Sequence, residues 1–450
     1  MKPGMNLIPP RGDRYRPGVL LCSDMLTRCR GRMAAGRMTM IRWTARFRCA
    51  AALFLVSSLP FASVVAETAE QGKLRPLAEA YNRSGQDLFR TFAGEPGNIV
   101  FSPYSIGTAM AIVQSGARGE TQTELHRVLR HRLPPAEVDA AHAQALAMLR
   151  AHSAEPVPSA TLRIANGLML VNAAATVAPE FQETIRTQYG AEIFKGATID
   201  TVNTWVKDKT EGKIERILAR LDPNDSHVLL TAVYFKAPWA SAFAPSATRD
   251  RPFTLVNGEA VHVPTMSQQS EFAIAKGEGL AAIRLPYAVE GLSMTIVRPD
   301  DAEGLNKLIA GLDGAKTESI LQSVRDAQKR NVALSMPRFK FEFKADLIAP
   351  FKSLGMSRVF DPAQSDLSGL TGKMRSEAPS TIDQIVHRAV IEVAEEGTEA
   401  AAATAIVVTT RAMRLDDVER FAIDRPFLFF ITDDKTGAIL FQGRVSDPRS

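Results

Sequence analysis

Side chains that could perform catalysis are scattered along this chain and match no complete catalytic motif. Lys435-Thr436-Gly437 resembles the KTG of β-lactamases and penicillin-binding proteins, but that chemistry also needs Ser-x-x-Lys, and no serine here has a lysine three residues later. The chain has no G-x-S-x-G elbow and no H-E-x-x-H motif, and Gly314-Ala315-Lys316-Thr317 lacks the glycine spacing of a P-loop. No metal-ligand spacing connects the seven histidines, which are His126, His131, His142, His152, His227, His262 and His387. We therefore expect no enzyme, no cofactor and no metal, with a secreted hydrolase as one alternative.

The segment Glu395–Arg414, EEGTEAAAATAIVVTTRAMR, carries the most functional information in the sequence. Two arginines, Arg411 and Arg414, follow a run of small side chains. At a spacing of two, one face is uncharged and consists of Thr398, Ala400, Ala402, Thr404 and Ile406. The opposite face consists of Glu399, Ala401, Ala403, Ala405 and Val407. Such a segment could enter a sheet without burying a charge, with Gly397 supplying backbone freedom at its start. A surface helix or a linker is the alternative, because alanine suits either state.

The distribution of charge and cysteine argues against two other classes of function. The chain has 450 residues, with 54 Lys and Arg, 49 Asp and Glu, and a formal net charge of +5. Residues 1–66 hold eleven of the basic residues, two of the acidic ones and all three cysteines, Cys22, Cys29 and Cys49. The remaining residues carry a net charge of −4 and no cysteine. We therefore expect no nucleic-acid binding, no disulfide and no thiol nucleophile in the working protein.

Residues 1–66 have the order of regions expected of a secretory signal peptide. Arg42, Arg46 and Arg48 precede the apolar run 50–66, and Val64-x-Ala66 supplies small residues before a cut at Glu67. We expect the true start to be Met38 or Met40 and the product to be periplasmic or secreted, with no membrane attachment after cleavage. An uncleaved membrane anchor is the alternative, although serines and a proline interrupt the run.

Residues 67–450 show helical spacing first and strand-like alternation later, which favours an α+β fold in a single domain. Helices are expected over 74–92, 102–113, 121–129, 135–150, 179–189 and 202–218. The third of these would begin with a capping box, Thr121-x-x-Glu124. Strands are expected over 162–171, 228–235, 281–285, 293–297 and 332–343, with a final hairpin of 426–432 and 438–443. Lys435-Thr436-Gly437 then belongs to the turn of that hairpin.

Several segments resemble one known family. EEGTEAAAATA resembles the hinge of the reactive loop in inhibitory serpins. Further segments are similar to serpin segments and follow in the same order: NIVFSPYSI (98–106), TQTEL (121–125), VNTWVKDKTEGKIERIL (202–218) and LTAVYFKAPW (230–239). They are followed by MPRFKFEF, LGMSRVFD and SDLSGL (within 336–370), HRAVIEV (387–393), and the closing DRPFLFFI and GAILFQGRVSDP. The resemblance covers residues 72–447.

This resemblance implies a serpin fold with three β-sheets, eight or nine helices and an exposed reactive loop at about 397–415. It also implies a metastable inhibitor that a protease attacks as a substrate. The cut loop then inserts into the main sheet while the protease is still attached as a covalent acyl-enzyme. A non-inhibitory serpin acting as a substrate, carrier or chaperone is the alternative. The partner would be a serine protease, and we expect a monomer.

Family spacing from Glu395 places the scissile bond at Arg411–Ala412, with Arg414 as the competitor. An arginine there suits a protease pocket with an acidic floor, so a trypsin-like target is expected. Both arginines could instead be ordinary solvated loop residues. The helix over 135–150 has one Lys or Arg, so the sequence shows no basic stripe for a heparin-like cofactor.

The resemblance also assigns roles to individual residues. The hinge comprises Glu395, Glu396, Gly397, Thr398, Glu399, Ala400, Ala401, Ala402, Ala403 and Thr404. Control of sheet opening falls to Ser102, Ser105, Thr231 and His387. Thr231 stands where the family usually has Asn, and its hydroxyl offers fewer donors than an amide. Trp239, Arg338 and Glu395 would guard the point where the loop enters the sheet, with an ion pair between Arg338 and Glu395.

Overall fold

The computed structural model describes residues 59–154, 160–277, 279–398 and 418–449. The hinge residues from Glu399 onward, the expected bond Arg411–Ala412 and the competitor Arg414 lie outside the described residues. Most of the expected leader, residues 1–58, lies outside them as well.

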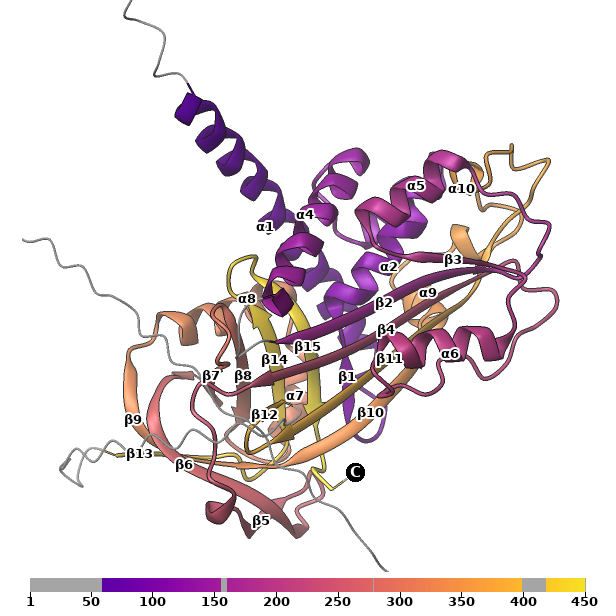
Figure 1. Ribbon diagram of the computed structural model, residues 1–450. Helices are drawn as coiled ribbons and strands as arrows, with labels where there is room; N and C mark the ends of the chain where they lie inside the picture. The colour runs from indigo at the N-terminus through magenta and orange to yellow at the C-terminus, as the bar shows by residue number, and fades with distance from the viewer. Residues whose placement is uncertain (1–58, 155–159, 278, 399–417, 450) are drawn as a thin grey trace, which may run out of the picture. The chain divides into compact units, whose positions relative to one another are not determined.

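Helices dominate the first half of the described chain, and strands dominate the second (Figure 1). The described α-helices are α1 (Leu59–Thr91), α2 (Pro103–Gly116), α3 (Gly119–Val128), α4 (Pro135–Ala154), α5 (Pro179–Gln188), α6 (Ile199–Lys209), α7 (Gly304–Ala310), α8 (Gly314–Asp326), α9 (Ile348–Ser353) and α10 (Ser368–Thr371). Two 3₁₀ turns, η1 (Pro245–Ala247) and η2 (Arg358–Phe360), complete the set. No described helix is long and apolar enough to cross a membrane.

One sheet has six strands in the order β10-β11-β12-β4-β2-β3. Its strands are β2 (Thr161–Leu170), β3 (Glu192–Lys195), β4 (His227–Pro238), β10 (Phe339–Asp346), β11 (Ile382–Ala394) and the two-residue β12 (Gly397–Thr398). Most neighbours are antiparallel, but β11 and β4 run parallel, and so do β2 and β3. We call the long junction between β4 and β11 the seam.

The other described strands form one nine-stranded sheet in the order β1-β15-β14-β8-β7-β6-β9-β13, with β5 beside β6. They are β1 (Ile99–Phe101), β5 (Arg249–Thr254), β6 (Ala260–Gly277), β7 (Leu280–Pro286), β8 (Leu292–Pro299), β9 (Lys329–Pro337), β13 (Glu419–Ala422), β14 (Phe427–Asp433) and β15 (Ala438–Val445). The long strand β6 pairs with β5 at its start, with β9 along its middle and with β7 at its end. Through β6, all of these strands belong to one hydrogen-bonded sheet. The expected final hairpin is confirmed as β14 and β15.

Helix α2 lies between the two sheets, in contact with β4 on one side and β15 on the other. It begins as the sequence predicts: the Ser102 side chain accepts a hydrogen bond from the backbone N–H of Ser105, and Pro103 occupies the first turn. Nearly all of its residues are buried, which explains why its sequence is apolar all round. This helix fixes the back of the six-stranded sheet.

Strand β4 is buried on both faces, as a central strand should be. Leu229 and Val233 belong to the main core on the α2 side. Val228 and Leu230 pack instead with Val202 and other residues of α6 on the opposite face. Figure 1 shows α6 lying across that face of the sheet. The seam is therefore covered on one side by α2 and on the other by α6.

The capping box predicted at Thr121 and Glu124 is wrong. Helix α3 begins at Gly119, so both residues lie inside it. The Thr121 hydroxyl accepts a hydrogen bond from the N–H of Asp366, and Glu124 Oε1 accepts from the N–H groups of Ser357 and Arg358. These side chains anchor a distant segment of the chain, which local sequence cannot reveal.

Two predicted elements also have different limits. The helix expected over 202–218 ends at Lys209, because the backbones of Glu211 and Gly212 adopt positive φ and turn the chain out of the helix. The strand expected over 332–343 is two strands, β9 and β10, separated at Arg338 directly after Pro337. Because proline cannot donate a ladder hydrogen bond, a break there is physically reasonable.

Candidate functional site: the hinge and the seam

The seam joins β4 and β11 along most of their length. Their parallel register runs from His227 opposite Ile382 to Tyr234 opposite Val390. Beyond that register, β12 lies between the two strands: Thr398 pairs with Val393 on one side and with Ala237 on the other. Both β12 ladders are antiparallel. The first two residues after the Glu395–Glu396 pair therefore already occupy the top of the seam as a short central strand.

Thr398 is the first inward-facing residue predicted for the hinge, and its side chain is fully buried. Its hydroxyl shares a 2.7 Å hydrogen bond with the hydroxyl of Tyr287. Tyr287 in turn stacks on Trp239, with ring centroids 4.6 Å apart and planes 7° from parallel. The predicted inward face is thus confirmed for this residue, while Ala400, Ala402, Thr404 and Ile406 lie outside the described residues.

Gly397 occupies a position that no other residue could take without displacement. A Cβ atom built there would lie 2.2 Å from the carbonyl oxygen of Ala237, far inside van der Waals contact. The glycine therefore lets the hinge backbone approach β4 closely enough to form the β12 ladder.

The three residues predicted to guard the top of the sheet do come together. Glu395 Oε1 accepts a hydrogen bond from the Thr248 hydroxyl at 2.7 Å and lies 3.6 Å from Arg338 Nη1. The Trp239 indole N–H donates to the carbonyl oxygen of Ala394, and the Trp239 backbone N–H donates to that of Glu396. Because Arg338 is about half exposed, its ion pair contributes little, and the backbone bonds hold the hinge.

The four residues predicted to control sheet opening also meet, beneath the middle of the seam. His387 on β11 lies opposite Thr231 on β4. The Ser105 and Thr231 hydroxyls share a 2.6 Å hydrogen bond, and the Ser102 N–H donates to His387 Nε2 at 3.4 Å. All four side chains are fully buried. Helix α2 is thus tied to both strands of the seam.

Burial lowers the pKa of His387 to about 3, so its imidazole is neutral. Because Nε2 accepts from Ser102, the ring proton resides on Nδ1, which has no hydrogen-bond partner among the described residues. The Thr231 hydroxyl reaches Ser105 and leaves this N–H unpaired. Thr231, which stands where the resemblance implies an Asn, therefore coincides with an unsatisfied buried donor at the seam.

A further group at the foot of the seam was not predicted. Asp383 Oδ2 accepts hydrogen bonds from the backbone N–H groups of Ser226 and His227, at 2.6 and 3.3 Å. The adjacent Gln384 amide donates to Asp225, and the His227 ring lies 3.0 Å from the carbonyl oxygen of Thr381. These bonds cross between the starts of β4 and β11. Asp383 and Tyr287 match no motif, and only the pairing of strands distant in sequence reveals their positions.

Among the described residues, no group of three or more His, Cys, Asp or Glu could hold a metal ion. Lys435 and Thr436 lie in the β14–β15 turn, where Thr436 donates a hydrogen bond to Asp433. The interpretation of this KTG as a hairpin turn is therefore confirmed.

Comparison with known proteins places these features in a family. A family model for serpins (serine protease inhibitors) matches residues 79–448. The chain is 35% identical over 388 residues to an uncharacterised serpin-like protein of Thermococcus kodakarensis, covering 84% of this chain and 88% of that protein. It is 36% identical over 394 residues to the leukocyte elastase inhibitor of Homo sapiens, covering 83% of this chain and all of that one.

Solved structures agree with this assignment. The crystal structure of Serpin48, a highly specific serpin of the insect Tenebrio molitor, matches with a TM-score of 0.70 at 30% identity. That match covers 82% of this chain and 98% of the other. The six-stranded sheet with its seam, the hinge at its top and these similarities show together that the chain belongs to the serpin family.

Proposed function

We propose that this serpin inhibits trypsin-like serine proteases by inserting its cleaved reactive loop into the seam. The observation that carries the proposal is β12: the hinge has already separated β4 from β11 at the top, with Thr398 inside and paired on both sides. Names of similar proteins, such as the human leukocyte elastase inhibitor, support protease inhibition in general. The family model that matches the chain is likewise described as one of serine protease inhibitors.

The proposed reaction begins as ordinary proteolysis. The protease serine attacks the carbonyl carbon of Arg411, the amine of Ala412 leaves, and Arg411 becomes an ester of the serine. The freed loop then extends β12 downward between β4 and β11, and the attached protease is carried with it. Inhibition requires that this insertion outpace hydrolysis of the ester. Each new residue pair exchanges parallel ladder bonds for antiparallel ones on both sides, which favours completion.

Side chains on the inward face decide whether insertion can run to completion. Thr398 fits because it is small and its hydroxyl finds Tyr287. An arginine there would have to bury its charge against β4 and β11, at a cost of several kcal/mol. We expect T398R to be cleaved as a substrate without trapping the protease. T123R, which adds the same charge at an exposed site on α3, should still inhibit.

Incubation with trypsin tests the proposal. The expected result is a complex that survives SDS gel electrophoresis, with a released peptide beginning at Ala412. A peptide beginning at Leu415 would move the reactive bond to Arg414. Cleavage without any stable complex would support the non-inhibitory alternative and overturn the proposal. R411Q should lose inhibition of trypsin, whereas R414Q should retain it.

We also propose that residues 1–66 direct export and are removed before Glu67. The support is the charged, apolar and small-residue order of that segment. Helix α1 begins at Leu59 and therefore spans the expected cut. Mass spectrometry of the protein recovered from the periplasm or medium of a bacterial host should show Glu67 as its first residue. Retention of the leader on membranes would favour the anchor instead.

A further inference from the structure

Between α10 and the seam strand β11 the chain leaves the surface of the molecule in a turn that comprises residues 372–379. Gly372 ends α10 with a positive φ of 70° and directs the chain outward, and Ser380 is buried again. Every residue from Gly372 to Glu377 is exposed. We call residues 372–379 the exposed turn. We infer that a trypsin-like protease cuts this turn after Arg375 in the folded protein, independently of the reactive loop.

Local contacts alone hold the exposed turn. The carbonyl oxygen of Met374 accepts hydrogen bonds from the backbone N–H groups of Glu377 and Ala378, at 2.9 and 3.1 Å. Within the described chain, residues 373–379 form hydrogen bonds only inside the segment 371–380. Met374 is 65% exposed, so its side chain does not anchor the turn in the core. A segment with so few contacts opens locally at little cost, and entry into a protease site requires such opening.

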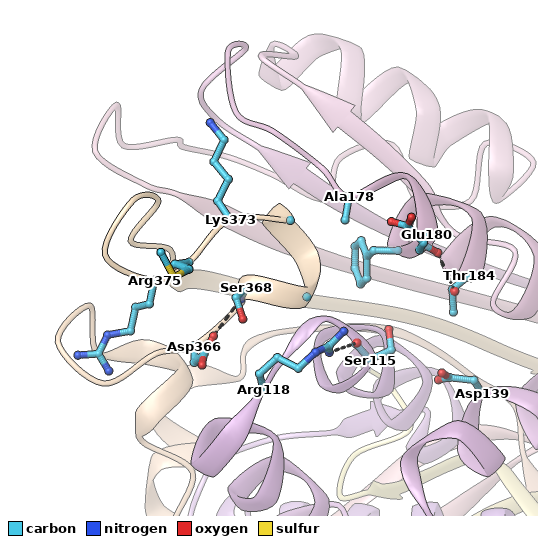
Figure 2. A pocket seen from close by; sticks show the side chains of 14 residues that line it. Ser115, Arg118, Asp139, Ala178, Glu180, Thr184, Asp366, Ser368, Lys373 and Arg375 are labelled. Carbon is cyan, nitrogen blue, oxygen red and sulfur yellow. Dashed lines mark hydrogen bonds between the residues drawn. The ribbon is translucent and has the colours of Figure 1, made fainter.

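Open space borders the exposed turn on one side. A hollow of about 740 Å³ lies there, and Glu180 and Phe181 in the first turn of α5 line its other wall (Figure 2). Figure 2 shows the side chains of Lys373 and Arg375 extending from the turn in different directions. No described element packs against the turn on the side of the hollow, so a protease has room to approach both basic side chains.

Hydrogen bonds around the two basic residues favour the bond after Arg375. The protease serine must reach the carbonyl carbon of the residue that its pocket recognises. At Lys373 the carbonyl oxygen accepts from the Thr371 hydroxyl at 3.2 Å, and the next N–H, that of Met374, donates to a carboxylate of the turn at 3.2 Å. The carbonyl oxygen of Arg375 and the N–H of Ser376 have no hydrogen-bond partner in the described chain. The bond Arg375–Ser376 is therefore the more accessible of the two.

The cut itself is ordinary hydrolysis. The protease serine attacks the carbonyl carbon of Arg375, and Ser376 leaves as an amine with the proton that the protease histidine took from the serine. Water then hydrolyses the ester, which frees the serine and leaves a carboxylate on Arg375. The piece that carries the ester ends after α10 and contains neither β11 nor β12. Because that piece has no segment to insert into the seam, the protease is released.

Another exposed segment shows the contrast. Residues 210–226, after α6, also lack regular secondary structure and include the exposed Arg216. There, however, Ile217 is fully buried, and the Asn203 side chain accepts hydrogen bonds from the backbone N–H groups of Ile217 and Leu218. A protease that cut after Arg216 would have to pull apolar side chains out of the core. Exposure of an arginine alone is therefore not enough, and the exposed turn is the better substrate.

Contacts on both sides of the exposed turn should hold the two pieces together after the cut. Before the turn, the carbonyl oxygen of Leu370 accepts a hydrogen bond from the N–H of Ala178 at 2.8 Å. After the turn, β11 keeps its ladders to β10 and to β4. The expected product is a folded protein of two chains. Its second chain begins at Ser376 and includes β11 and both strands of the final hairpin.

Brief trypsin digestion of the double variant R411Q/R414Q tests the inference apart from the proposed inhibition. The two substitutions remove both arginines of the reactive loop, and residues 399–419 contain no other lysine or arginine. The first cut within residues 76–449 should give a fragment that begins at Ser376, identified by N-terminal sequencing from an SDS gel. The two pieces should elute together in gel filtration without denaturant. Failure of the wild type to inhibit trypsin would leave these results unaffected.

Three substitutions in the same background serve as controls. R375Q should slow the cut at least about tenfold, because an acidic pocket rejects glutamine. K373Q and R216Q should be cut as fast as the parent variant. A first fragment that begins at Met374 or Ile217 would overturn the inference, and so would equal rates for R375Q and its parent. Elution of the two pieces as separate peaks would overturn the predicted two-chain product.

Discussion

Acid should destabilise this protein strongly, because three histidines are held neutral in its interior. Burial lowers the pKa values of His131, His142 and His387 to about 3 each. An exposed histidine in the unfolded chain has a pKa of about 6.5. Between pH 6.5 and 3 the unfolded chain therefore binds more protons than the folded one. The free energy of unfolding falls as the pH falls through that window and levels off below about pH 3.

The size of the effect follows from these values. At pH 7.5 each histidine contributes almost nothing to the pH dependence. At pH 5 each lowers the free energy of unfolding by about 2 kcal/mol, since the pH lies about 1.5 units below the unfolded pKa and each unit corresponds to about 1.4 kcal/mol. The three together remove about 6 kcal/mol, a large part of the stability of a typical domain.

Urea unfolding of the uncleaved protein, followed by fluorescence at pH 7.5, 6 and 5, measures this loss. H387Q removes one titrating group, so its free energy of unfolding should fall by about 2 kcal/mol less than that of the wild type over the same range. H262Q replaces an exposed histidine on β6, and its free energy of unfolding should fall as much as that of the wild type. A wild-type free energy of unfolding that is constant from pH 7.5 to 5 would refute the reasoning. If the free energy of unfolding of H387Q falls as much as that of the wild type between pH 7.5 and 5, the contribution assigned to His387 is wrong.

Three further substitutions test the seam and its anchors. G397A places a Cβ against the Ala237 carbonyl and should expel β12, so the number of inhibitor molecules used per trypsin trapped should rise severalfold; an unchanged number would contradict the close approach. D383N weakens the hydrogen bonds to the Ser226 and His227 N–H groups at the foot of the seam by roughly 1–3 kcal/mol. The uncleaved protein should therefore lose inhibitory activity on heating at least about fivefold faster than the wild type. An equal rate would show that these bonds do not hold β4 and β11 together. E124A leaves the N–H groups of Ser357 and Arg358 without their acceptor. The free energy of unfolding in the urea assay should therefore fall by roughly 2–3 kcal/mol. A fall below about 0.5 kcal/mol would show that water replaces the Glu124 carboxylate as the acceptor.

The sequence predicted those parts of the fold that depend on local pattern. The Ser102–Pro103 start of α2, the β14–β15 hairpin and the inward face of the hinge at Thr398 all follow from spacing and residue type. Grouping Trp239, Arg338 and Glu395 required resemblance to a family, because these residues are up to 156 positions apart.

Other features depend on contacts between distant segments and were missed for that reason. Thr121 and Glu124 fit a capping box locally, yet they bind the segment 357–366 instead. Asp383 looks like any acid before a strand until His227 is found beside it.

The direction of the seam has a consequence of its own. Since β4 and β11 are parallel, a segment that is antiparallel to one is necessarily antiparallel to the other, as β12 is. A loop that enters from the top therefore meets matching edges on both sides, while a segment running the opposite way would form two parallel ladders. The direction of β4 and β11 alone thus favours segments that enter the seam antiparallel to both strands. Insertion of the cleaved loop between β4 and β11 should therefore increase the amide I absorption of antiparallel sheet, which infrared spectroscopy measures on unlabelled protein.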